Sequence, residues 1–167
     1  AGAEVAMGGG RRYKKADVRG FDFTRHMRAV CEDMVARVSE LAHIDMSRVA
    51  ISLSQARKAG AHGVHASLTP MRFQGGVRAG KRRGRYYKTQ VLLNGEGQEM
   101  LYILSFCLPR FMDVEFSEKL VTIVHELWHV SPEFDGDLRR HAGRCYVHTG
   151  SKKNYDRDMK RLADAWL

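Results

Sequence analysis

Residues 116–130 decide the fold, and they read Phe-Ser-Glu-Lys-Leu-Val-Thr-Ile-Val-His-Glu-Leu-Trp-His-Val. The apolar residues of this stretch lie nearly all round a helical projection, which is typical of a buried helix. Ser117 is a suitable N-cap residue, and Pro132 prevents the helix from continuing beyond Val130. The stretch therefore predicts a buried helix over residues 116–130.

Three polar residues interrupt this apolar helix with the spacing H-E-x-x-H, namely His125, Glu126 and His129. Residues four apart share a helix face, so both imidazoles can point at one ion, about 2.0–2.1 Å from each nitrogen in a zinc site. Glu126 lies beside them, where it can hold and deprotonate a water molecule. Three unpartnered polar groups would be costly to bury. The spacing therefore favours a zinc centre over a chance cluster.

Residues 125–141 resemble the signature of a family of phage and bacterial metallopeptidases of the zincin-like class. In zincins, the motif helix packs under a small sheet whose edge strand holds the substrate in extended form. The resemblance implies a hydrolase, a metalloendopeptidase with one Zn²⁺ per chain, in which Glu126 is the general base. Leu108-Pro109-Arg110-Phe111 and the strand before it fit the same family.

The third metal ligand has three candidates. His141 matches the family's histidine after its Leu-Arg-x element, and we take it first. The alternative is His148, which stands just before the last predicted helix, an arrangement that resembles the SprT-type proteases. Asp135 comes third: it lies six residues after His129, where metzincins place a ligand, but Pro132 stands where that class needs glycine.

Peptide hydrolysis also needs a group that stabilises the developing oxyanion. Tyr146 and Tyr155 are our candidates, together with Arg144 and whichever of the two later histidines is not a ligand. Asp135 and Asp137 have two further interpretations. They are acceptors for a ligand imidazole N–H, or they are turn residues around Gly136.

Outward from the motif helix, the sequence predicts an α+β domain with a small mixed β-sheet and N- and C-terminal helices. We expect residues 1–20 to be a flexible basic tail and residues 21–167 to form a single zincin-like domain. The sequence also predicts a helix over 22–43 and strands near 49–53 and 64–73, with Pro70 at an edge or bulge. A solvated loop over 75–84 follows. A strand over 85–93 is then joined by an Asn94-Gly95 turn to a partner strand over 100–108, and Ser151 caps a last helix.

The composition sets limits on location. The chain has 167 residues, of which 44% are hydrophobic, and this is enough for one ordinary core. Its longest apolar run, residues 100–108, is much shorter than the roughly 20 residues of a membrane-spanning helix. Cys31, Cys107 and Cys145 are odd in number and scattered, which argues against a disulfide framework. We therefore expect a cytoplasmic protein with no membrane partner.

The formal net charge of +9 raises a second hypothesis. Basic residues gather at 11–15, 78–88, 139–144 and 152–161, and Tyr86 and Tyr87 interleave with the second group. Such patches can follow a phosphate backbone, so nucleic acid is a possible partner beside a peptide or protein substrate. The alternative function is a nucleic-acid-binding or regulatory module whose zinc is structural or vestigial. A Glu126→Gln variant separates the two, because only an enzyme would lose turnover.

Overall fold

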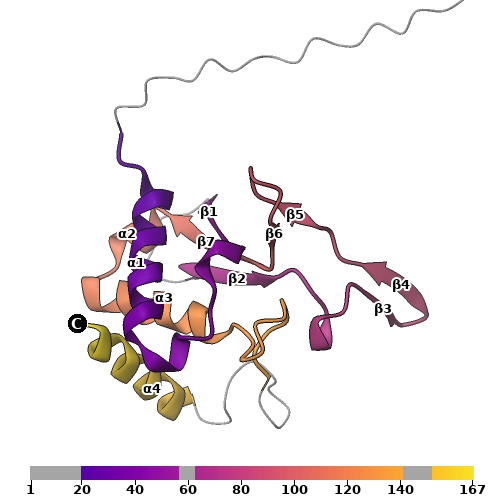
Figure 1. Cartoon of the computed structure of the whole chain (residues 1–167). Coiled ribbons are helices and arrows are strands. Elements are labelled where there is room, and N and C mark those ends of the chain that lie inside the picture. Colours follow the sequence, from indigo (N-terminus) through magenta and orange to yellow (C-terminus); the bar gives the residue numbers. More distant parts are fainter. Residues whose placement is uncertain (1–19, 57–62, 141–151) are drawn as a thin grey trace, which may run out of the picture.

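The central strand of the fold is β7 (Tyr102–Leu108), seen in a computed structural model that describes residues 20–56, 63–140 and 152–167. It pairs in parallel with β1 (Val49–Gln55) and antiparallel with β2 (Ala66–Pro70), so the order is β1-β7-β2 (Figure 1). The expected small mixed sheet is therefore present. Pro70 ends the edge strand β2, and Pro109 directly follows β7, as the sequence predicted.

One face of this sheet forms the core. Tyr102, Leu104 and Phe106 alternate along β7, and all three side chains are fully buried. The ring of Phe106 makes edge-on contacts with Phe23 and Phe111, at centroid distances of 5.6 and 4.8 Å. These contacts hold α1 (Phe23–Arg37) and the short α2 (Arg110–Asp113) against the sheet.

The first helix is shorter than predicted. Asp22 caps α1, because its carboxylate accepts the backbone N–H of Arg25 at 3.0 Å. At Val38 the backbone turns to φ −97° and ψ 106°, outside the helical region, and the predicted helix over 22–43 is wrong beyond that point. Leu41 still reaches the core through a 3₁₀ turn (Ser39–Leu41), which is why the apolar spacing continued past the helix end.

The motif helix is α3 (Phe116–Trp128). Its N-cap is Glu115, so Ser117 lies inside the helix and the predicted cap is wrong; His129 is the C-cap residue. Burial is uneven along the helix, because Phe116 is 62% exposed whereas Leu127 is fully buried. The helix is thus embedded around its motif rather than over its whole length. The last helix, α4 (Lys152–Trp166), packs against α3, and its residues Tyr155, Met159 and Leu162 are buried.

The prediction of a solvated loop over 75–84 is wrong for the second half of that segment. A 3₁₀ turn (Gln74–Gly76) is followed by β3 (Ala79–Arg82), which pairs antiparallel with β4 (Arg85–Lys88). Arg83 and Gly84 have φ of +49° and +78°, the two positive values that a tight two-residue hairpin turn requires. The hairpin escaped prediction because it buries no apolar face and so has no hydrophobic alternation.

The pairing predicted across Asn94-Gly95 is also different. Only the short β5 (Leu92–Leu93) and β6 (Glu99–Met100) pair there, while β7 joins β1 and β2. The side chain of Asn94 accepts the backbone N–H groups of Glu96 and Gln98 at 3.0 and 2.8 Å. These bonds close a longer loop in place of a two-residue turn.

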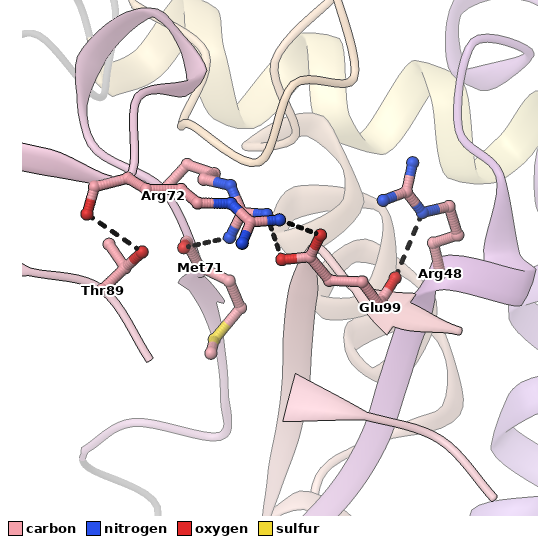
Figure 2. Close-up of polar contacts among 6 residues, drawn as sticks. Arg48, Met71, Arg72, Thr89 and Glu99 are labelled. Carbon is pink, nitrogen blue, oxygen red and sulfur yellow. Dashed lines mark hydrogen bonds and ion pairs between the residues drawn. The ribbon is translucent and has the colours of Figure 1, made fainter. Parts of the chain in front are cut away.

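A polar cluster joins these hairpins to the sheet (Figure 2). The carboxylate of Glu99 pairs with Arg72 and with Arg78, and its backbone oxygen accepts the Nε–H of Arg48 at 3.1 Å. The Arg72 side chain is only 5% exposed. The hydrogen bond from Arg72 to the Glu99 carboxylate, together with the charges of Arg72 and Arg78, holds the pKa of Glu99 below its ordinary value.

In the described ranges, no helix has both the length and the apolar character needed to cross a bilayer.

Candidate metal centre

The two motif histidines converge. Their Nε2 atoms lie 3.0 Å apart, and the rings stand nearly perpendicular, at 86°. Two nitrogens that each bind one tetrahedral zinc at 2.0–2.1 Å lie about 3.3 Å apart. The donor pair therefore fits a zinc ion with a small outward movement of the rings. Without a metal, the same distance suits an N–H···N hydrogen bond.

Glu126 is buried on the same helix, with 9% of its surface exposed. Burial raises the pKa of its carboxyl group to about 7, and a hydrogen bond from the backbone of Leu68 acts in the opposite direction. A carboxyl group with a pKa near neutrality can both accept and return a proton at physiological pH. Leu68 belongs to β2, so Glu126 faces the edge strand of the sheet.

The register of β2 explains this contact. The backbone N–H of Cys107 donates to the oxygen of His65, and that of Met71 donates to the oxygen of Leu101. Because hydrogen-bonded pairs alternate along an antiparallel ladder, the backbone groups of Ala66 and Leu68 point away from β7. The edge of the sheet beside Glu126 thus offers backbone donors and acceptors to an extended chain.

Tyr155 closes the centre from α4. Its ring lies edge-on to His125 with centroids 5.1 Å apart, and stacks near His129 at 6.4 Å. The residue is 3% exposed. Burial, with a further contribution from the charge of Glu126, raises the pKa of the phenol above its ordinary value. The hydroxyl therefore stays protonated at neutral pH and remains a hydrogen-bond donor.

The segment after α3 folds back onto the motif. Val130 and Leu138 form an antiparallel bridge, and the backbone N–H of Arg139 donates to the oxygen of His129 at 2.7 Å. The Arg139 side chain donates to the oxygen of Trp128 at 2.7 Å and lies over its ring, 4.1 Å from the centroid. The Arg139 guanidinium thus satisfies the carbonyl of Trp128, the last residue of α3, where the helix dipole favours positive charge.

Gly136 makes this return path possible. It has φ +89°, and an added Cβ would come within 2.5 Å of the Arg72 side chain. The hydroxyl of Tyr102 accepts the N–H of Gly136 at 3.0 Å and donates to the oxygen of Asp137 at 2.8 Å. The buried sheet residue Tyr102 therefore anchors the turn.

The aspartates near this turn have local partners. Asp135 accepts the N–H of Asp137 at 3.1 Å, as expected for a turn residue. The carboxylate of Asp137 receives two hydrogen bonds from Arg140, both at 2.9 Å, and one from the backbone of Gly75. Burial alone would raise the pKa of Asp137, but these hydrogen bonds lower it below its ordinary value.

The remaining site candidates fall outside the described residues, namely His141, Arg144, Tyr146 and His148. Within the ranges that the structure does describe, no three His, Cys, Asp or Glu side chains gather as a metal site, so Asp135 does not complete one with the two histidines there. Among the described residues, His125 and His129 thus stand as a pair, and the sequence candidates for a third ligand, His141 and His148, lie in residues 141–151. The described chain enters that segment at Arg140, beside the bonded pair Arg139 and His129, and leaves it at α4, which carries Tyr155.

A groove of about 690 Å³ lies along α3 and α4, and no residue of the H-E-x-x-H motif lines it. Val121 and Thr122 line it, one helical turn before His125 and Glu126, and His65 lies at its β2 side. Carboxylates outnumber cations in its lining, which contains Lys160 and three acidic residues: Glu118, Asp156 and Asp164.

Two contributors to this site were not found from the sequence. Leu68 contributes its backbone, which no sequence motif marks. Pro70 gave only an indirect signal, because it indicated an edge strand. Arg139 follows no motif spacing, since its contacts with Trp128 and His129 arise from the fold-back of the segment. Comparison of the chain with protein-family models, curated proteins and solved structures finds no match.

Proposed function

We propose that this protein is a zinc-dependent metallopeptidase that cleaves peptide bonds within an extended substrate. The observation that carries the proposal is the convergence of His125 and His129, with Nε2 atoms 3.0 Å apart, beside the buried carboxyl group of Glu126. A buried carboxyl group with a pKa near 7, next to two imidazoles, suits hydrolysis better than a purely structural metal site, which needs no titratable neighbour.

His125 and His129 would hold the metal, with His141 as the first candidate for the third ligand and His148 as the alternative. We look for the ligand in residues 141–151 because the described residues near both ends of this segment contact the motif: Arg139 bonds to His129, and Tyr155 packs against His125. When bound, zinc supplies a Lewis acid that polarises a carbonyl group and makes water more acidic.

The chain's own groups supply the remaining chemistry. Glu126 takes the proton of the attacking water and passes it to the leaving amine. Tyr155 donates a hydrogen bond to the oxygen that gains negative charge. The outward backbone groups of Ala66 and the outward carbonyl oxygen of Leu68 hold the substrate as an added strand, in the way that edge strands bind extended peptides.

A Glu126→Gln variant tests the proposal. We expect it to keep its fold and its zinc but to lose hydrolysis of a fluorescently labelled, unfolded protein substrate. Glu133→Gln is the matched control, because Glu133 is exposed and lies outside the helix that carries the motif. Equal turnover in wild type and Glu126→Gln would overturn the assignment of Glu126. A zinc-loaded wild type without any hydrolysis would favour a structural or vestigial metal in a regulatory module.

A further inference from the structure

The β3–β4 hairpin carries positive charge that nothing nearby in the sequence offsets. No Asp or Glu stands between Asp45 and Glu96. The hairpin and its turn expose five basic side chains, which are Lys81, Arg82, Arg83, Arg85 and Lys88. The charge therefore forms a continuous exposed surface.

The tip of the hairpin sets like charges against each other. Arg82 is directly opposite Arg85 in the register, and Arg83 occupies the turn between them. Like charges directly across a strand pair are destabilising. Among the described residues, the ion pairs found include none of these three arginines. An anionic partner would relieve this repulsion.

The shape of the hairpin narrows the choice of partner. It projects away from the helices as a two-stranded ribbon (Figure 1). Strands of four residues are about 13 Å long at 3.3–3.4 Å per residue. The major groove of B-form DNA is about 12 Å wide and 8.5 Å deep, and it admits a two-stranded ribbon. The hairpin is thus long enough to reach the groove floor.

The two faces of the ribbon favour a duplex over a single strand. Cross-strand pairing puts Lys81, Tyr86 and Lys88 on one face and Arg82, Arg85 and Tyr87 on the other. Basic groups on both faces suit a groove with phosphates along both walls. A platform for unpaired bases needs its aromatic rings on one face. Here the rings are on opposite faces, and the Lys81 Nζ lies 5.3 Å from the centroid of the Tyr86 ring.

The root of the hairpin is fixed to the domain. The N–H and hydroxyl of Thr89 both donate to the backbone oxygen of Arg78, at 2.8 and 3.3 Å. The Arg78 side chain pairs with Glu99, which also contacts buried Arg72 (Figure 2). A ribbon anchored in this way loses little conformational freedom on binding, which favours affinity.

We propose that the β3–β4 hairpin inserts into the major groove of double-stranded DNA and binds its phosphates without sequence preference. The tip arginines and Lys81 make the contacts. This inference is independent of hydrolysis, since the hairpin shares no residue with the metal centre.

The experiment measures fluorescence anisotropy of a labelled, mixed-sequence DNA duplex two helical turns long, titrated with full-length protein over a range of salt concentrations. The test variant is Lys81→Gln/Arg82→Gln/Arg85→Gln. The control is Arg25→Gln/Arg28→Gln/Arg37→Gln, which removes the same charge from α1, outside the four basic groups of the sequence. Circular dichroism and thermal melting establish that each variant is folded, so that a loss of binding reports on the hairpin.

We expect the hairpin variant to bind the duplex at least about tenfold more weakly, and the slope of log K against log salt to become shallower by about 0.9 for each lost contact. The control should bind within about twofold of wild type. A charge-preserving Arg82→Lys/Arg85→Lys variant should keep the wild-type slope, and a DNA duplex should bind more tightly than a DNA single strand or an RNA duplex. Three results would overturn the proposal: equal losses in both triple variants, unchanged affinity in the hairpin variant, or preference for the single strand or the RNA duplex.

Discussion

The Nε2 atoms of His125 and His129 lie 3.0 Å apart on consecutive turns of α3, close to the separation of two nitrogens bound to one zinc ion. We predict one zinc per chain in protein purified without added metal. His125→Ala should abolish zinc binding, because a site that lacks one of its two helix ligands loses most of its affinity for zinc. Elemental analysis at equal folded concentration measures this.

The control is His26→Ala, which removes an exposed histidine of α1. The same assay on His141→Ala and His148→Ala identifies the third ligand, since only one of these should lose the metal. Protein that takes up no zinc when it is offered would show that the histidine pair is a metal-free hydrogen bond.

Tyr155 packs against both motif histidines and is 3% exposed. We predict that Tyr155→Phe keeps the fold and the zinc but lowers kcat by about 10²-fold, the usual effect of removing one oxyanion donor. KM should change little, because the ring and its packing remain. Tyr86→Phe, at an 82% exposed position, is the control. An unchanged kcat would leave Tyr155 with a packing role alone.

The Glu99 carboxylate neutralises Arg72, whose side chain is 5% exposed. Glu99→Gln should lower the free energy of unfolding by about 2 kcal/mol. Removal of one partner from a fully buried pair costs more than this, but Arg72 retains its hydrogen bond to Met71 and Glu99 keeps some solvent contact. Urea denaturation at neutral pH measures the change, and exposed Glu96→Gln should show almost none.

The same pair predicts a pH dependence. The pKa of Glu99 is lower in the folded protein than in the unfolded chain, mainly because of its hydrogen bond from Arg72. The stability it contributes is therefore complete above the unfolded value of about 4.3 and is lost as the pH falls through the lower folded value. The difference in stability between wild type and Glu99→Gln should shrink in that acidic range. A constant difference would show that the charge of Glu99 is not what stabilises the pair.

Sequence patterns predicted those parts of the fold that bury apolar side chains. The apolar residues from Leu120 to Leu127 located α3, and the apolar run over residues 100–108 located a buried strand. Patterns failed where local polar geometry decides the structure, as with the longer loop that Asn94 closes with its side chain and the hairpin that turns at Arg83-Gly84. In the site, the sequence predicted His125, Glu126 and His129 because a single helix fixes their spacing. Leu68 and Arg139 reach the site only through sheet register and chain return, which no local spacing encodes.

The groove beside the motif predicts a preference among substrates. Glu118, Asp156 and Asp164 face it with Lys160 as the cation of its lining, so a basic substrate side chain should gain electrostatic attraction there. We expect kcat/KM to be about threefold to tenfold higher for a peptide with Lys than for one with Glu at the position that occupies the groove, as partly exposed charge pairs contribute up to about 1 kcal/mol each.

Glu118→Gln/Asp164→Asn should remove most of this preference without loss of zinc, and its effect should weaken at high salt because both carboxylates contact solvent. The matched control, Glu32→Gln/Glu96→Gln, removes the same charge from exposed positions outside the groove lining. Because the readout is a ratio between two peptides cleaved by the same enzyme, a general loss of activity cancels. An equal ratio in wild type and in the groove variant would show that substrate side chains do not enter the groove between α3 and α4.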